Sequence, residues 1–295
     1  MALSRLKATK RSLMKRGLFA QYDGEMQKLI SKGYAKAVST NVSNPGTKVW
    51  YLPHQAVVSD KKLGKIRIVF DCAAKFDGEA LNDKCLQGPN LTNNFVYVLL
   101  RFREHAYAEI ADIEAMYYQV VIPKEDRDAL RFFWFNDAGE IVLYRMTRHV
   151  FGGVWCSSSF AYALGRVLVD NVDVPPLVSD TIKQSFYVDD CLKSLPYKSL
   201  VSEVFEGTTE VLSKGGFRLT KFVINTEELL SLVPVQERAS EVEFLKDFDG
   251  RALGIAWDVV GDEFFFKVNL AQECDPKLTR RKILSMLASI YDPLG

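Results

Sequence analysis

Two adjacent aspartates inside a short apolar segment constrain this chain more than any other feature. Residues 185–192 read SFYVDDCL, so Asp189 and Asp190 lie between two apolar runs. Side chains on an extended strand alternate between its faces, so neighbouring carboxylates reach one point only where the chain turns. The segment therefore predicts a tight β-hairpin with both aspartates at its tip. Clustered carboxylates repel one another unless a cation holds them, and their hard oxygens suit Mg²⁺ or Mn²⁺.

A solvated Asp-Asp turn is the alternative, and a third carboxylate on a neighbouring strand would distinguish the two. Asp112 ends a short strand predicted over residues 107–112, after which the spacing of apolar residues becomes helical. A carboxylate at the end of a strand that leads into a helix is in a usual place for a catalytic group. We therefore expect Asp112 on a central strand beside the hairpin that carries Asp189.

Composition excludes several classes of protein. The chain has 295 residues, of which 48% are hydrophobic and 25% charged, so it has ample material for a core. Its 38 basic residues nearly balance its 37 acidic residues, so net charge does not indicate a nucleic-acid partner. Five cysteines without a C-x-x-C pair and three scattered histidines predict neither disulfides nor zinc. No apolar run is long enough to cross a membrane, so no membrane partner is expected.

Periodicity and turn residues predict an α+β protein built from helices and antiparallel hairpins. The predicted helices cover 1–16, 22–31, 95–105, 157–169, 201–212 and a last segment from 276. The predicted strands cover 49–52, 65–71, 107–112, 129–135, 141–146, 217–222, 252–257 and 263–268. The first helix carries six basic residues and no acid, which suits either a solvated face or a helix lying on phosphates.

Two further features suggest contacts with a phosphorylated ligand. Lys65 and Arg67 share one face of the strand predicted over 65–71, and paired cations suit a polyphosphate. An exposed polar strand face is the alternative. Phe151 and Gly152 precede the helix predicted over 157–169, where glycine lets the backbone approach a ligand, unless it serves only packing.

The order of these features resembles the palm of reverse transcriptases. More specifically, nine short motifs resemble the BEL/Pao group of LTR retrotransposons, and together they span nearly the whole chain. They are RIVFD at 67–71, LND at 81–83, QGP at 87–89, RFR at 101–103, ADI at 111–113, FG at 151–152, YVDD at 187–190, GGF at 215–217 and IYDPLG at 290–295. The chain departs from the family at Val150 and near Ser157, where the family has prolines.

The resemblance implies a right-hand polymerase fold, with fingers, a palm built on an antiparallel sheet flanked by helices, and a truncated thumb. The implied parts are an N-terminal helical segment over 1–40, fingers over 41–106, a palm over 107–225 with a fingers insertion around 123–147, and a primer-grip hairpin with the start of a thumb over 226–295. The implied activity is RNA-directed DNA polymerisation from dNTPs on an RNA or DNA template with a primer. The thumb and RNase H regions of a parent polyprotein are expected beyond this chain. The resemblance also implies that the protein resides in a cytoplasmic retrotransposon particle or in the nucleus.

The resemblance also implies the ligands of two Mg²⁺ ions, for which Mn²⁺ could substitute. Asp112 and Asp189 would bridge both ions, with Asp190 as the accessory carboxylate and the Ile113 carbonyl as a backbone ligand.

The remaining implied roles concern the nucleotide and the primer. Lys65 and Arg67 would neutralise the incoming triphosphate, and Tyr117 would stack under the sugar and exclude a 2′-hydroxyl. Phe151 and Gly152 would line the base and sugar pocket. Lys221 would protonate the pyrophosphate, unless it is a surface lysine on an edge strand. Residues 253–254, with the hairpin after them, would hold the primer end.

Two other functions remain open at this point. A catalytically inactive derivative, truncated or domesticated, would keep the fold and could still bind nucleic acid. The three aspartates favour activity, whereas the absent thumb favours weak processivity or none. A metal-dependent hydrolase using the same aspartates would need a His or Glu partner motif, and the sequence offers none.

Overall fold

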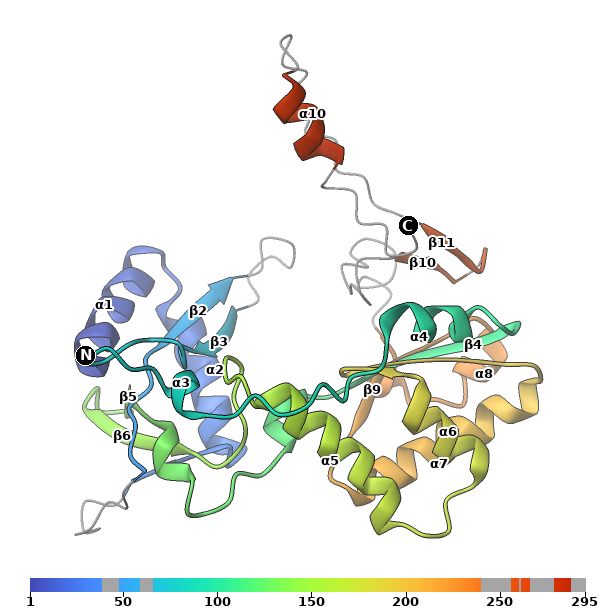
Figure 1. Ribbon diagram of the computed structural model, residues 1–295, viewed down its shortest axis with the longest axis horizontal. Helices are drawn as coiled ribbons and strands as arrows, with labels where there is room; N and C mark the ends of the chain where they lie inside the picture. The colour runs from blue at the N-terminus through green and yellow to red at the C-terminus, as the bar shows by residue number, and fades with distance from the viewer. Residues whose placement is uncertain (39–47, 59–65, 240–255, 260, 266–278, 288–295) are drawn as a thin grey trace. The chain divides into compact units, whose positions relative to one another are not determined.

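The computed structural model describes residues 1–38, 48–58, 66–239, 256–259, 261–265 and 279–287 (Figure 1). The chain forms two compact units, which are described separately here. Unit 1 contains Met1–Thr92 and Ala115–Arg166, and unit 2 contains Asn93–Glu114 and Val167–Gly295. Both combine helices with antiparallel sheets, so the α+β class is confirmed. Within the described residues, no helix is long and apolar enough to cross a membrane.

Unit 1 is built around two small antiparallel sheets, one with strand order β1-β6-β5 and one formed by β2 and β3. Its strands are β1 (Ala35–Ala37), β2 (His54–Val58), β3 (Ile66–Phe70), β5 (Arg131–Phe135) and β6 (Ile141–Met146). Its helices are α1 (Ala2–Lys15), α2 (Phe19–Ser31), α3 (Leu81–Lys84), η1 (Met116–Gln119), η2 (Arg127–Leu130) and α5 (Cys156–Asp170), whose last residues belong to unit 2.

The core of unit 1 is aromatic, and His54 lies within it. The Tyr22 hydroxyl lies 2.7 Å from His54 Nδ1, and His54 Nε2 donates to the carbonyl of Phe133 at 3.0 Å. Burial lowers the pKa of His54 to about 4, so the ring is neutral at physiological pH. Trp134 packs edge-on against both Tyr22 and His54. His54 is therefore a structural residue, as its isolation in the sequence predicts.

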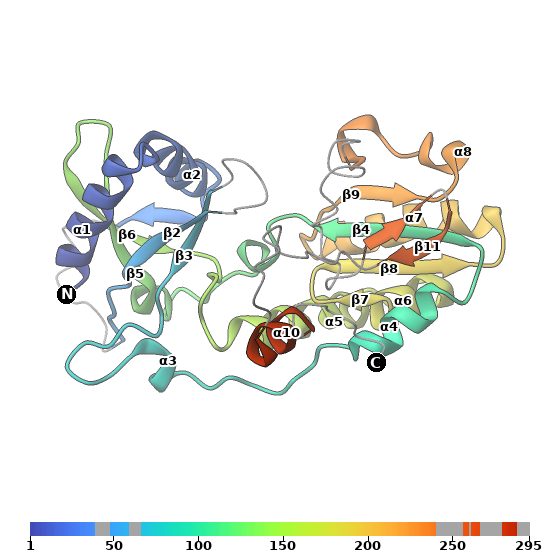
Figure 2. The same ribbon diagram turned by 90° about the horizontal axis from the view of Figure 1, so that it is seen from above.

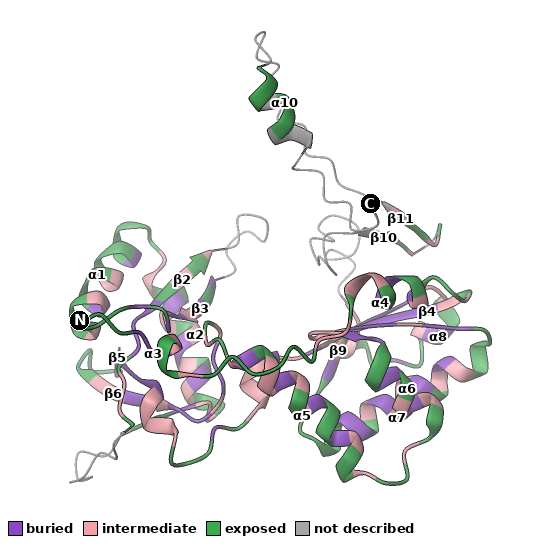
Figure 3. Cartoon of the chain, viewed as in Figure 1, coloured by how far each residue is buried: buried purple, intermediate pink, exposed green. Residues whose placement is uncertain are grey.

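Unit 2 contains a four-stranded antiparallel sheet with strand order β7-β8-β4-β9 (Figure 2). Its strands are β4 (Tyr107–Ile113), β7 (Phe186–Tyr187), β8 (Asp190–Leu195) and β9 (Leu219–Ile224). Its helices are α4 (Phe95–Phe102), α6 (Pro176–Gln184), α7 (Lys198–Lys214), α8 (Glu227–Leu230) and η3 (Val235–Glu237). Figure 3 shows that the strands are largely buried, whereas the helices keep exposed faces.

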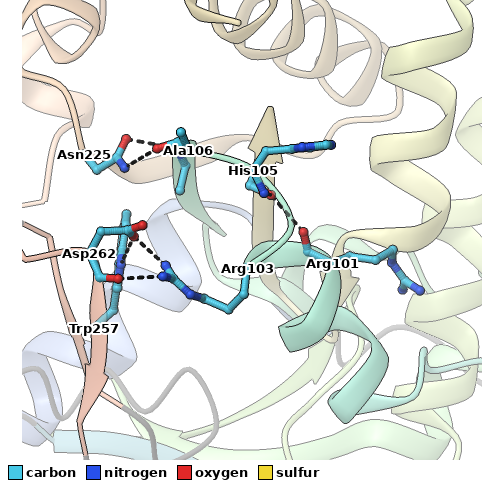
Figure 4. A network of polar contacts seen from close by, with 9 residues as sticks. Arg101, Arg103, His105, Ala106, Asn225, Trp257 and Asp262 are labelled. Atoms are coloured by element: carbon cyan, nitrogen blue, oxygen red, sulfur yellow. Dashed lines mark hydrogen bonds and ion pairs between the residues drawn. The ribbon is translucent and has the colours of Figure 1, made fainter. Parts of the chain in front are cut away.

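A short hairpin of β10 (Ala256–Asp258) and β11 (Glu263–Phe265) is attached to the end of α4 (Figure 4). Arg103 donates to both the side chain and the carbonyl of Asp262, and Trp257 Nε1 donates to the same carboxylate at 2.9 Å. Phe102 packs edge-on against Trp257, with ring centroids 5.0 Å apart. These polar and aromatic contacts join the hairpin to the rest of unit 2. A last helix, α10, covers Arg280–Leu287.

Several boundaries differ from the sequence prediction. The strand predicted over 49–52 is wrong, because only Tyr51 forms a bridge, to Arg131, and Pro53 follows it. The sequence prediction missed β2, which pairs along the full length of β3. It also missed α6, which begins with proline at its first position. The helix predicted over 95–105 ends at Phe102. Residues 252–255 and 266–268 of the last predicted hairpin lie outside the described residues.

Candidate functional site

The β7–β8 hairpin places two of the three candidate aspartates beside the third. In the antiparallel ladder of β4 and β8, Asp112 lies directly opposite Asp190. The Ile113 amide donates to the Asp189 carbonyl at 2.9 Å, which fixes the turn against the end of β4. Because directly paired residues share a sheet face, the Asp112 and Asp190 side chains leave the sheet on the same side. The expectation that Asp112 lies on a central strand beside the hairpin is confirmed.

The turn itself is held in an unfavourable backbone conformation. Tyr187 pairs with Asp190, which leaves Val188 and Asp189 as a two-residue loop. Val188 has φ of +56°, a value that β-branched residues rarely adopt. Positive φ at the first central position is typical of a type II′ hairpin turn, where glycine is preferred. A valine there costs about 1–2 kcal/mol, so the surrounding sheet must maintain the turn.

Burial and neighbouring charge make Asp190 a weak acid. Desolvation, followed by the negative charges of Asp189 and Asp112, raises the pKa of Asp190 to about 8, and Lys221 opposes the rise. Asp190 therefore carries a proton in the folded protein at neutral pH. A group in this state would ionise readily if a cation came close, because the cation would offset both causes of the shift.

Lys221 supplies positive charge to the cluster through an irregularity in β9. Two residues of β9, Lys221 and Phe222, lie between the pairs Asp112–Thr220 and Ile110–Val223, where β4 has only Ala111. Lys221 is the bulged residue and has φ of +57°. Its ammonium lies 3.0 Å from Asp112 Oδ1, with the Lys221 side chain half-exposed. The bulge thus directs this lysine at the carboxylate of the central strand.

The donor chemistry at this sheet end suits a hard divalent cation. It offers carboxylate oxygens that repel one another and a protonated Asp190, and oxygen ligands are what Mg²⁺ and Mn²⁺ prefer. In the described parts of the chain, however, no group of three or more His, Cys, Asp and Glu side chains is arranged as a ready metal site. The residues therefore fit the ions chemically, while in this structure the Asp112 carboxylate is paired with Lys221.

A second group of candidate residues lies within unit 1. Tyr117, on η1, packs against Phe151 with ring centroids 4.9 Å apart. Its hydroxyl shares a 2.7 Å hydrogen bond with the Ser157 hydroxyl at the start of α5. Phe160, one turn further along α5, lies edge-on to Tyr117 at 6.0 Å. The structure therefore brings Tyr117 and Phe151 together and fixes the Tyr117 ring at both its face and its hydroxyl.

Gly152 is required by a close approach of two backbone segments. The Phe70 amide donates to the Phe151 carbonyl at 3.1 Å, which draws the loop onto β3. Gly152 has φ of +122°, and a Cβ there would lie 2.1 Å from the Phe70 carbonyl oxygen. Asn82, which the sequence analysis did not single out, spans the same loop by donating to the Gly152 carbonyl at 3.2 Å and accepting from Val154. The LND motif at 81–83 was the signal for this asparagine.

Replacing Gly152 with alanine is expected to destabilise the protein by about 3 kcal/mol or more, because the new Cβ would collide with backbone at a strained φ. Urea denaturation measures the change. Gly24→Ala is the matched control, since a Cβ there meets nothing within 4 Å in the middle of α2, and alanine should stabilise that helix by about 0.5–1 kcal/mol. Equal stabilities of the wild type and Gly152→Ala would contradict the steric argument.

The two cations predicted to share a strand face are only partly described. Arg67 lies on β3 with its side chain exposed, between the buried Ile66 and Ile68, and it pairs across the sheet with Val57. Lys65 lies outside the described residues, as do residues 253–254, which were expected to hold the primer end. The shared face therefore stays a prediction, while the exposed position of Arg67 leaves its guanidinium accessible.

Glu109 is a buried acid that the sequence analysis missed. It lies on β4, opposite Lys193 of β8, and only 4% of it is exposed. Among the described residues, its Oε2 atom has no hydrogen-bond partner. Burial raises the pKa of Glu109 to about 8, and Lys193 opposes the rise. Because side chains alternate along β4, Glu109 and Asp112 project from opposite faces of the sheet.

The free energy of unfolding is expected to depend on pH through Glu109. The folded carboxyl stays protonated up to about pH 8, whereas the unfolded one ionises near its ordinary pKa of 4.5. The part of the stability that depends on Glu109 is therefore fully present below pH 4.5 and is lost as pH rises toward 8, at about 1.4 kcal/mol per pH unit.

Glu109→Gln should remove this pH dependence. The free energy of unfolding of the variant should therefore rise relative to that of the wild type from pH 5 to pH 8. Urea denaturation at each pH, with EDTA present, measures it. Glu203→Gln, at an exposed position on α7 of the same unit, is the control and should leave the pH profile unchanged. Parallel profiles for wild type and Glu109→Gln would contradict the prediction.

No protein-family model matches the chain, and no curated protein matches it. Solved structures do. The crystal structure of a Prototype Foamy Virus protease-reverse transcriptase mutant is 17% identical over 68% of this chain and 23% of its own, with a TM-score of 0.50. Two foamy viral protease-reverse transcriptase structures, in complex with double-stranded DNA and with an RNA/DNA hybrid, are 19% and 17% identical, with TM-scores of 0.48 and 0.47.

The chain spans less than a third of the length of these proteins. The matched region covers 28%, 23% and 22% of the three solved chains. At this level of identity the similarity shows the fold alone. The chain therefore has the α+β fold of a right-hand polymerase, with antiparallel sheets flanked by helices.

Proposed function

We propose that the chain is the reverse transcriptase domain of a longer polyprotein, and that it adds deoxynucleotides to a primer on an RNA or DNA template. The observation that carries the proposal is the pairing of Asp112 with Asp190 across β4 and β8, with Asp189 held at the adjacent turn. Three acidic side chains gathered at one end of a central antiparallel strand have little structural use, because burial and neighbouring negative charge hold Asp190 in its protonated form. They suit a site that binds cations and phosphates.

In this proposal Asp112, Asp189 and Asp190, with the Ile113 carbonyl, hold two Mg²⁺ ions, and Mn²⁺ can replace them. When bound, these ions would activate the primer hydroxyl and neutralise charge on the triphosphate. Asp190 would lose its proton on loading, since its raised pKa comes from burial and from its two acidic neighbours. Lys221 would give up its ion pair with Asp112 and, being half-exposed, could then donate a proton to the departing pyrophosphate.

The unit 1 candidates would handle the incoming nucleotide. Arg67, exposed on β3, would bind the triphosphate together with Lys65, because charge-assisted hydrogen bonds to phosphate are strong. Tyr117, fixed by Phe151 and Ser157, would lie under the sugar. Phe151 and Gly152 would line the base and sugar pocket. The absence of a Cβ at Gly152 lets this loop lie against the backbone of Phe70.

Primer extension by the purified chain tests the proposal. A labelled DNA primer on a poly-RNA template should be extended by dNTPs with Mg²⁺ or Mn²⁺, and EDTA should abolish extension. A poly-DNA template in parallel distinguishes RNA-directed from DNA-directed synthesis. If the folded protein extends neither primer with either ion, it is a non-catalytic derivative that retains the fold, and gel-shift binding of the same primer–template would then measure whether it still holds nucleic acid.

We further propose an origin in a BEL/Pao-type LTR retrotransposon, which the ordered motifs from RIVFD at 67–71 to IYDPLG at 290–295 support. The proposed parts are the helical segment 1–40, the fingers 41–106, the palm 107–225 with its insertion around 123–147, and the primer-grip and thumb segment 226–295. The genomic sequence around this reading frame tests the origin, since an RNase H region should follow it. Fractionation of host cells would show whether the protein resides in cytoplasmic particles or the nucleus.

A further inference from the structure

Helix α1 carries a row of cations that the proposed nucleotide chemistry does not use. Lys7, Arg11 and Lys15 follow one another at intervals of four residues, so they project from one face of the helix at steps of about 6 Å. All three are exposed, and Figure 3 shows exposed residues along α1. These three residues are called the α1 basic row below.

The α1 basic row has no acidic partner among the described residues. Helix α1 itself contains no acid. It packs against α2, β2 and β5, and both acids on those elements are engaged elsewhere. Asp23 accepts from Trp134 Nε1 at 2.8 Å, and Glu25 lies 2.6 Å from the ammonium of Lys28. The three positive charges are therefore available to a ligand.

The α1 basic row destabilises the helix that carries it. Like charges four residues apart repel one another, and the row contains two such pairs. The helix dipole favours only Lys15, which lies in the last turn. Other cations of α1 serve the fold, since Arg5 pairs with Asp71 at 2.9 Å and the Lys10 ammonium lies 4.0 Å from the centre of the Phe135 ring. A local feature that opposes folding in this way is typical of a functional surface.

Small residues border the α1 basic row. Ser4, Ala8 and Ser12 are also spaced by four and exposed, so no bulky side chain separates the cations from a ligand lying along the helix. A nucleic-acid strand carries one negative charge per nucleotide, and lysine, arginine and serine are common donors to its phosphate oxygens. The regular spacing of the cations suits such a repeating polyanion better than a single anionic group.

A lipid surface fits α1 less well. Helices that lie on membranes insert an apolar face into the headgroup region. The apolar face of α1 is already used, because Leu6 and Leu13 are almost fully buried in the core of unit 1. Leu3 and Met14 stay exposed, but they lie about 16 Å apart along the helix and form no continuous apolar face.

From these features we infer that the α1 basic row binds the sugar-phosphate backbone of one nucleic-acid strand, without regard to base sequence. The three cations contact phosphates of neighbouring nucleotides, and the small residues let the strand lie close to the helix. The choice of a nucleic acid among polyanions rests on the proposed function, whereas the binding itself requires no catalysis.

Fluorescence anisotropy of labelled oligo(dT) with the full chain, measured across a range of salt concentrations, tests the inference. Each phosphate contact with a single strand adds about 0.7 to the slope of log affinity against log salt. Lys7→Gln/Arg11→Gln/Lys15→Gln should therefore lower that slope by about 2. Between about 50 and 200 mM salt, the wild type should lose about 20-fold more affinity than the variant.

The control is Lys28→Gln/Lys48→Gln/Lys84→Gln, which changes the net charge of unit 1 by the same amount. Each of these lysines is paired with an acid, so this variant should keep the wild-type slope. An unchanged slope in the α1 variant would overturn the inference. Equal slope changes in the two triple variants would also overturn it, because general charge would then explain the binding.

Arg11→Glu separates binding from folding. It places an acid between Lys7 and Lys15 and so replaces two repulsive pairs with two attractive ones. The urea midpoint should rise while affinity for oligo(dT) falls, a combination that misfolding cannot produce. A higher midpoint with unchanged affinity would show that the row is only a solvated face, and would overturn the inference.

Lysine acetylation followed by peptide mass spectrometry locates the bound strand. Saturating oligo(dT) should slow acetylation of Lys7 and Lys15 and leave Lys75, an exposed lysine elsewhere in unit 1, unchanged. Unprotected Lys7 and Lys15 would overturn the assignment to α1. Flotation with phosphatidylserine vesicles tests the lipid alternative, and vesicle binding through the same cations without oligo(dT) binding would overturn the choice of nucleic acid.

Primer extension by the same preparations separates this inference from the proposed function. Oligo(dT) binding that depends on the α1 basic row, in a protein that extends no primer, would support the inference and reject the polymerase proposal alone. Primer extension by the wild type, together with an unchanged salt slope in the α1 variant, would support the polymerase proposal and overturn the inference.

Discussion

Replacing Asp112 with asparagine is expected to lower primer extension by about 1,000-fold. In the proposed mechanism this carboxylate would help to hold the ions, and metal ions supply several kcal/mol of charge stabilisation in such reactions. At 1.36 kcal/mol per decade, a loss of about 4 kcal/mol corresponds to a factor of about 10³. Asparagine is nearly isosteric with aspartate, so the pairing with Asp190 should persist. Single-turnover extension on the RNA template measures the rate.

Folding must be measured beside activity, because Asp112 also pairs with Lys221 at 3.0 Å. That ion pair is partly exposed, so its loss should change stability by about 1 kcal/mol or less. Asp180→Asn, at an exposed position on α6 of the same unit, is the matched control and should retain full activity. An Asp112→Asn protein that extends primers within about tenfold of the wild-type rate would contradict the proposed site.

Replacing Tyr117 with valine is expected to relax the choice of sugar by about 100-fold. A bulky ring under the sugar leaves no room for a 2′-hydroxyl, and steric rejection of such a group is worth about 2–3 kcal/mol. The substitution should raise ribonucleotide use while leaving deoxynucleotide use partly intact. The ratio of kcat/KM for dNTP over rNTP, in wild type and variant, measures the effect.

Tyr117→Phe separates the ring from its hydroxyl. It keeps the ring that contacts Phe151 and loses the hydroxyl that bonds Ser157, so the ratio should stay near the wild-type value. Trimming a packed ring also threatens the fold. If kcat/KM falls equally for both nucleotides in Tyr117→Val, the residue serves packing, and its role in sugar selection is wrong.

Local chemistry made the hairpin that carries Asp189 and Asp190 predictable from the sequence. Adjacent aspartates between apolar runs require a turn, and β7 and β8 meet where that argument places it. The hairpin of residues 131–146 was equally clear, since polar turn residues separate two β-rich runs. The strand 49–52 was wrong, because β-branched and aromatic residues there serve packing rather than a ladder.

What the sequence could not supply depended on contacts between distant segments. Glu109 looks like a surface residue of an alternating strand, and only the packing of unit 2 buries it. The pairing of Lys221 with Asp112 depends on a β-bulge, and no local residue pattern predicts a bulge there. Asn82 gains its role only when the loop at Gly152 lies beside it. Each depends on which neighbour a residue meets, which periodicity does not encode.

The bulge in β9 also affects how the chain tolerates changes in length. Lys221 and Phe222 together face Ala111, whereas Thr220 and Val223 keep their partners on either side. Deleting Lys221 alone would therefore restore a continuous ladder, with Phe222 opposite Ala111 and every other pair retained. Such a deletion should leave the sheet folded. It should impair the proposed activity, because it removes the ammonium beside Asp112. A relative with a one-residue gap at this position would thus be expected to retain the fold and to lack the proposed activity.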